Sequence, residues 1–98
     1  MFDKMKQLME LKKQADQIKK ELDAAQVECS DVRGIKIVMS GAQYVQDIQI
    51  DESLLKPENK KRFESDLLRG INAAVKKSQN LAAQRMKAVM PGGFPGLT

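Results

Sequence analysis

The sequence predicts an α+β fold: a long helix, a three-stranded antiparallel sheet and a second long helix. Apolar residues recur at steps of three and four near both ends of the chain, which is typical of helices that bury one face. In the middle they alternate with polar residues, and small residues separate the alternating runs as hairpin turns require. A chain of 98 residues with 4% aromatic residues suits one domain with a thin core, expected over residues 1–90.

The first helix is expected over residues 2–26. Its apolar residues form a heptad-like stripe with two seams, made of Leu8, Ala15, Leu22, Leu11 and Ile18. Lysines and acidic residues nearly balance along this helix, so its polar face is expected to be solvated and to hold ion pairs four residues apart, such as Asp16 with Lys20. The stripe predicts packing against a partner helix.

Three strands are expected over residues 26–30, 35–40 and 44–50. Arg33 and Gly34 supply a turn between the first two strands, and a small, flexible segment at residues 40–42 supplies the hairpin turn before the third. Three antiparallel strands are about the minimum that is stable when one face is covered by helices or by a second subunit.

Alternation predicts that the third strand is half-buried, with Tyr44, Ile48 and Ile50 on its apolar face and Gln46 interrupting that face. The two edges of a three-stranded sheet lack partners in a monomer, and an edge strand can pair with its copy in another chain. Because the core is also thin, we expect a homodimer.

The second helix is expected over residues 57–89. Pro57 suits its first position, and Glu58 places a negative charge at the positive end of the helix dipole. Gly70 in its middle costs about 1 kcal/mol of helix stability relative to alanine, which indicates a close backbone approach. Prolines and glycines after the helix predict a disordered tail over residues 91–98.

The composition argues against an enzyme and against a metal site. The chain has no histidine and one cysteine, Cys29, which is expected to be a small buried strand residue. Asp47, Asp51 and Glu52 lack a nucleophile or phosphate loop beside them, and Asp51 suits the end of a strand. We expect no cofactor and no small-molecule substrate.

No secretory signal and no apolar run near ~18 residues is visible in the sequence, so we expect a cytoplasmic protein without a membrane partner.

Charge is the strongest functional signal in the residues themselves. The formal net charge is +4, and no acidic residue follows Asp66. A long helix of one sign attracts polyanions by Coulomb steering and counterion release, without reading bases. The candidate DNA contacts are the basic residues of the second helix: Arg69, Lys76, Lys77, Arg85 and Lys87. Weaker candidates on the first helix are Lys12, Lys13, Lys19 and Lys20.

Four segments in this order resemble the YbaB/EbfC family of bacterial nucleoid-associated proteins: MFDKMKQLMELKKQADQIKKEL, SGAQYVQDIQIDESLL, DLLRGINAAVKKS and KAVMPGGFPG. The resemblance covers nearly the whole chain. It implies a tweezer-like homodimer whose paired helices grip double-stranded DNA with low to modest sequence specificity. It also implies a location in the nucleoid and a role in nucleoid organisation and gene regulation.

A second interpretation is a helix-hairpin adaptor or holdase chaperone that binds protein clients. Long amphipathic helices, six methionines and a small hairpin sheet favour it. The two interpretations differ in their salt dependence, since phosphate contacts weaken steeply as salt rises whereas apolar contacts persist.

Overall fold

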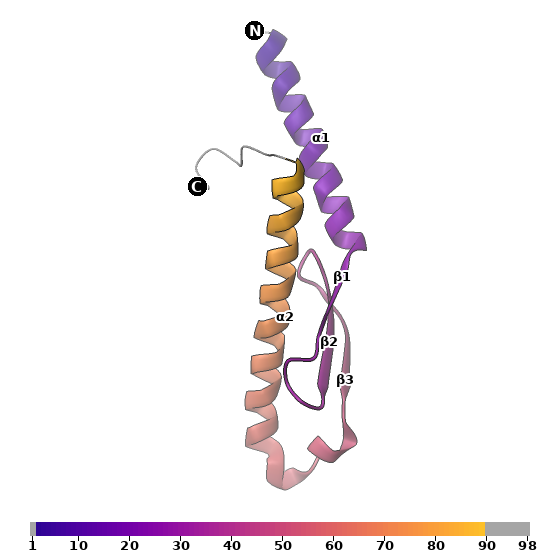
Figure 1. The fold of residues 1–98 in the computed structure, drawn as a ribbon, viewed down its shortest axis with the longest axis vertical. Helices are drawn as coiled ribbons and strands as arrows, with labels where there is room; N and C mark the ends of the chain where they lie inside the picture. The colour runs from indigo at the N-terminus through magenta and orange to yellow at the C-terminus, as the bar shows by residue number, and fades with distance from the viewer. Residues whose placement is uncertain (1, 90–98) are drawn as a thin grey trace.

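The structure is a computed structural model that describes residues 2–89 of the chain. Helix α1 spans Phe2–Ala24, strands β1, β2 and β3 span Gln26–Cys29, Ile35–Ser40 and Val45–Ile50, and helix α2 spans Lys60–Val89. Two 3-10 turns, η1 (Glu52–Leu54) and η2 (Pro57–Asn59), connect β3 to α2. The predicted α+β class, with two long helices around a three-stranded antiparallel sheet, is confirmed (Figure 1). The predicted disordered tail, residues 91–98, lies outside the described residues.

The sheet has the order β1-β2-β3, with both pairs antiparallel. Helix α2 lies along one face and contacts β1 and β2 (Figure 1). The core between them contains Cys29, Ile35, Ile37, Met39 and Ala74, each at most 3% exposed. Cys29 is therefore the buried strand residue that its apolar neighbours predict.

Strand β3 is more exposed than the sequence predicts. All of its residues are exposed except the half-buried Ile50, because α2 covers the other two strands. The strand also contains a bulge: Val38 pairs with Asp47 but Met39 pairs with Val45, which leaves Gln46 unmatched. The extra residue moves Val45, in place of Tyr44, onto the face that carries Ile48, so the predicted alternation is wrong before Asp47.

The hairpin between β2 and β3 explains why the third strand begins at Val45 and not at residue 44. The backbone N–H of Gln43 donates to the carbonyl of Ser40 at 3.0 Å, and Gln43 has a positive φ of 69°. This is a three-residue loop closed by a left-handed residue. The Ser40 hydroxyl accepts hydrogen bonds from the N–H groups of Ala42 and Tyr44, both at 3.2 Å.

The other predicted bounds need small corrections. Helix α1 ends at Ala24, before the predicted residue 26, because Gln26 already pairs with Ser40 in the sheet. Strand β1 ends at Cys29 rather than at residue 30. Helix α2 begins at Lys60 because Pro57 opens a separate 3-10 turn, in which the Lys60 N–H bonds the Pro57 carbonyl.

The junction between α1 and the hairpin is tight. The Gly41 N–H donates to the Ala25 carbonyl at 3.1 Å. A Cβ added at Gly41 would lie 2.9 Å from the carbonyl oxygen of Leu22. Nearby, the buried Ser78 hydroxyl of α2 donates to the Ser40 carbonyl at 2.8 Å. These contacts fix the direction in which α1 leaves the sheet.

Among residues 2–89, helix α1 is buried against the rest of the chain only towards its C-terminal end. Ile18 is 6% exposed, whereas residues 3–17 are all exposed, and the N-terminal half of the helix extends beyond α2 (Figure 1). The packing predicted for its stripe is thus present at Ile18 and absent at Leu8 and Leu11, which are 65% and 44% exposed.

Candidate nucleic-acid interface

Helix α2 carries three lengthwise stripes, set by its 3.6-residue turn. The first stripe faces the sheet and is built from small residues: Gly70 and Ser78 are buried, and Ala74 is 0% exposed. A Cβ added at Gly70 would lie 3.3 Å from Ile37 Cδ1, so the close backbone approach predicted at this glycine is confirmed. The small residues bring the helix axis near β2 and leave its two flanks for other contacts.

The second stripe is a row of cations on one flank of α2. Arg62, Arg69 and Lys76 recur every seven residues, and Lys87 continues the same side of the helix. All four side chains are exposed. At 1.5 Å per residue the row is about 37 Å long. We call these four residues the basic row.

The basic row has one internal counterion. Asp66, whose side chain is 18% exposed, accepts a hydrogen bond from Arg69 Nη2 at 3.2 Å and lies 4.0 Å from Arg62 Nε. Arginine has five N–H donors, so both guanidinium groups keep donors for another ligand. Lys76 and Lys87 have no carboxylate within 4.0 Å among residues 2–89.

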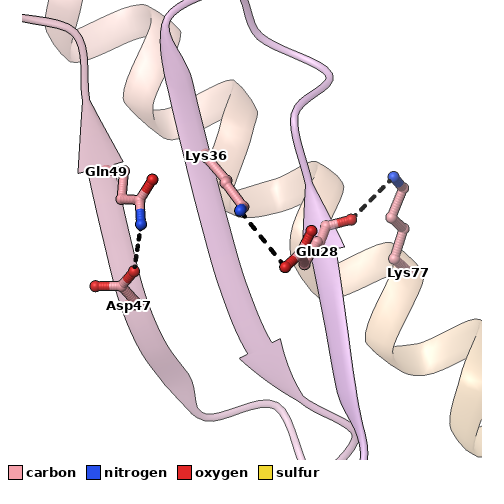
Figure 2. Close-up of polar contacts among 5 residues, drawn as sticks. All are labelled: Glu28, Lys36, Asp47, Gln49 and Lys77. Carbon is pink, nitrogen blue, oxygen red and sulfur yellow. Dashed lines mark hydrogen bonds and ion pairs between the residues drawn. The ribbon is translucent and has the colours of Figure 1, made fainter.

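Two predicted contact residues lie outside the basic row. Lys77 sits closer to the sheet, where its Nζ donates to the Glu28 carbonyl at 3.3 Å (Figure 2). The same Nζ pairs with Asp31 Oδ1 at 3.3 Å. It therefore has a carboxylate partner that is distant in sequence. Arg85 is exposed, but its position along the helix turns it away from the row.

The lysines predicted on α1 are all exposed: Lys12, Lys13, Lys19 and Lys20. Each lies away from the side of the helix on which Ile18 is buried. The expected pair between Asp16 and Lys20 is not formed, and no ion pair within 4.0 Å involves α1 in the part of the chain that the structure describes.

The uncovered face of the sheet has a mixed charge. Lys36 Nζ lies 3.5 Å from Glu28 Oε1, and Gln49 Nε2 donates to Asp47 Oδ2 at 3.2 Å (Figure 2). Exposed carboxylates on this face repel phosphate groups, whereas the α2 flank offers four cations and one partly covered carboxylate. The flank of α2 is therefore the better surface for a polyanion.

Sequence reasoning missed Arg62 as a member of the row and did not consider Arg33, which lies near it. The seven-residue spacing of Arg62, Arg69 and Lys76 is visible in the sequence and identifies the first of these. Arg33 follows β1, and only the folded chain brings it to the helix.

The third stripe lies on the opposite flank of α2 and is apolar. Leu68 is 63% exposed, and Ile71 and Val75 are half-buried. Lys77 reaches β1 from one side of α2, so the apolar flank is on the side of β3, whose Val45 and Ile48 are 46% and 39% exposed. We call these five residues the apolar side.

The fold and these surfaces define a class of protein: a small helix–sheet–helix protein with a cationic helix flank and no group of His, Cys, Asp or Glu suited to a metal ion among residues 2–89. None of the described helices is long and apolar enough to span a membrane. The profile of the YbaB/EbfC DNA-binding family matches residues 1–94, and the chain belongs to this family, as its sequence segments indicate.

Relatives with similar sequences carry the name nucleoid-associated protein. One from Syntrophobacter fumaroxidans is 30% identical over 98% of this chain and 89% of its own length. Another, from Chloroflexus aurantiacus, is 33% identical over 95% of this chain and 93% of its own. A third, from Afipia carboxidovorans, is 33% identical over 95% of this chain and 90% of its own.

Proposed function

We propose that this protein is a nucleoid-associated protein that binds duplex DNA as a homodimer, without catalysis, through the basic row of α2. Membership of a DNA-binding family supports a nucleic-acid ligand. The observation that supports this surface is the alignment of Arg62, Arg69, Lys76 and Lys87 on one exposed flank. We further propose a location in the nucleoid and a role in nucleoid organisation and gene regulation.

The proposed contacts are to phosphates, with low sequence preference. The row is about 37 Å long, close to the roughly 34–36 Å that one turn of duplex DNA spans. Flexible cations along an exposed helix flank can reach phosphates, whereas base readout needs side chains placed against base edges in a groove. The lysines of α1 are proposed as weaker contacts on the same DNA.

The two edges of the sheet favour different roles. The Gly41 N–H donates to the Ala25 carbonyl, and in an antiparallel ladder the inward-bonded and outward-pointing residues of a strand alternate. The Glu28 carbonyl therefore points to the outer edge of β1, where the Lys77 side chain caps it. No described element caps β3 in this way.

On β3, the Asp51 N–H bonds the Gly34 carbonyl at 2.8 Å, so alternation turns the backbone groups of Ile48 and Ile50 outward. The apolar side lies next to this edge. We therefore propose that two copies pair about a two-fold axis through β3 and cover the apolar side.

Glutamate substitutions at Lys76 and Lys87 test the DNA proposal. The double variant reverses two charges in the middle and at the end of the row, so its affinity for a labelled duplex should fall at least tenfold at low salt. The control is Lys36→Glu with Gln49→Glu on the uncovered sheet face, which we do not propose as a DNA contact. This control changes the net charge somewhat less than the Lys76 and Lys87 double variant does. Losses that simply follow the change in net charge of the two double variants would mean that net charge, and not the row, determines binding.

The dimer proposal is tested by sedimentation of Ile48→Lys, with Gln49→Lys as the control on the opposite face of the same strand. Burying an unpaired lysine in an apolar interface is strongly unfavourable, so the first variant should sediment as a monomer at concentrations where the control is a dimer. A monomeric wild-type protein, or a dimeric Ile48→Lys variant, would contradict the proposed interface.

One observation favours the adaptor or holdase function as a second candidate. Met5, Leu8 and Met9 on α1 are 65%, 65% and 64% exposed, and such an apolar surface suits a protein client. Client binding through these residues should persist as salt rises, whereas DNA binding should weaken.

A further inference from the structure

A groove lies at the end of the molecule where α2 begins. It has a volume of about 280 Å³ and is lined by Arg33 from the β1–β2 turn, Asp51 and Leu54 from the end of β3 and from η1, and Arg62, Asp66 and Arg69 from α2. This volume is several times the roughly 30 Å³ that one water molecule occupies in the liquid, so a phosphate group fits.

Three guanidinium groups and two carboxylates line the groove, and both carboxylates are already bonded. Asp51 Oδ1 accepts the Ser53 N–H at 3.0 Å, and this hydrogen bond lowers the pKa of Asp51. Asp66 is shared by Arg62 and Arg69, whose side chains are nevertheless 85% and 70% exposed. Free guanidinium donors thus outnumber free carboxylate oxygens in the groove.

Backbone geometry holds Arg33 beside the row. The Ile35 N–H bonds the Val32 carbonyl at 3.1 Å and closes a tight turn, and Gly34 in that turn has a φ of 86°. The Gly34 carbonyl accepts the Asp51 N–H, which ties the turn to the end of β3. Arg33 is exposed and has no carboxylate within 4.0 Å among residues 2–89.

We propose that this groove is a phosphate site, in which Arg33, Arg62 and Arg69 bind one phosphodiester of the DNA that lies along the basic row. The planar guanidinium group suits this ligand, since it donates two parallel hydrogen bonds to a phosphate. The inference rests on the proposed DNA-binding function and adds a contact from the sheet, which anchors the end of the row where α2 begins. Asp66 lies between the two helix arginines, within 4.0 Å of both, and so keeps them on the same side of α2.

The test is a salt titration of duplex binding for wild type, Arg33→Ala and Lys36→Ala. Each variant loses one positive charge, so the nonspecific effect of net charge is the same. If Arg33 binds the shared phosphate, Arg33→Ala should lower the affinity clearly more than Lys36→Ala does across the titration, because the phosphate loses a direct ligand as well as a distant charge. Arg33→Lys should restore part of the affinity, because it keeps the charge and loses the paired donors.

A double-mutant cycle tests whether the arginines share one phosphate. The losses from Arg33→Ala and Arg62→Ala should be clearly less than additive, whereas Arg33→Ala and Lys87→Ala, at opposite ends of α2, should be additive. An affinity of Arg33→Ala equal to that of Lys36→Ala, or strict additivity with Arg62→Ala, would overturn this site while leaving the basic row intact. Absence of duplex binding by the wild type would instead overturn the proposed function.

Discussion

Replacing Gly41 with alanine tests whether the junction between α1 and the hairpin is as tight as it appears in the structure. The new Cβ would lie 2.9 Å from the carbonyl oxygen of Leu22 and 3.2 Å from its Cα, and backbone atoms cannot move aside as side-chain ends do. Overpacking of this kind costs about 1–3 kcal/mol, and the smaller entropy of the unfolded alanine chain returns about 0.4–1 kcal/mol. We expect a net loss of about 1–2 kcal/mol.

Urea denaturation at one fixed protein concentration measures this loss, because the stability of a dimer depends on concentration. Gly70→Ala is the matched control. The nearest atom to its Cβ would be the Cδ1 end of the Ile37 side chain, at 3.3 Å, and alanine adds about 1 kcal/mol of helix propensity. This control should stay within about 1 kcal/mol of wild type. A Gly41→Ala protein as stable as wild type would show that α1 and the hairpin relax freely, and would refute the fixed junction.

Three further predictions concern single hydrogen-bonded groups. Ser78→Ala should lower the free energy of unfolding in urea by about 1 kcal/mol, since it removes a buried donor while the Ser40 carbonyl keeps its bond from Gln43. Lys77→Ala should change that free energy by less than about 1 kcal/mol, because its ion pair is half-exposed, and should weaken duplex binding less than Lys76→Ala does. The pKa of Asp51 is lowered in the folded protein, so its carboxylate contributes stability above the ordinary carboxyl pKa and loses that contribution as pH falls through the folded-state pKa. The difference in the free energy of unfolding between wild type and Asp51→Ala should therefore vanish at low pH.

The sequence was sufficient for the order and type of the elements because their periodicities are strong. Apolar residues stand at every second position of residues 35–40, at Ile35, Ile37 and Met39, and β2 has the predicted bounds. The faces of the strand expected over residues 44–50 were predicted less well. The bulge at Gln46 moves the residues before it to the opposite face, and a bulge depends on pairing between strands, which the sequence of one strand does not reveal. In the β2–β3 hairpin the left-handed residue is Gln43, just outside the predicted turn segment 40–42, and Gly41 serves close packing.

The candidate site was predictable in kind and only partly in detail. The spacing of Arg69, Lys76 and Lys87 along the sequence places all three on one side of a helix. The partner of Lys77 is Asp31, which is distant in sequence, so counting acids along the chain could not reveal it. Arg33 reaches the helix only through the β1–β2 turn.

The proposed grip of the basic row on phosphates is tested most directly by fluorescence anisotropy of a labelled duplex with wild-type protein between about 50 and 200 mM salt, with a scrambled duplex as competitor. Each phosphate that the row engages contributes about −0.9 to the slope of log affinity against log salt, so binding should weaken steeply as salt rises. The account predicts this steep loss together with effective competition by the scrambled duplex. Binding that does not change with salt, or no binding even at the lowest salt, would contradict it.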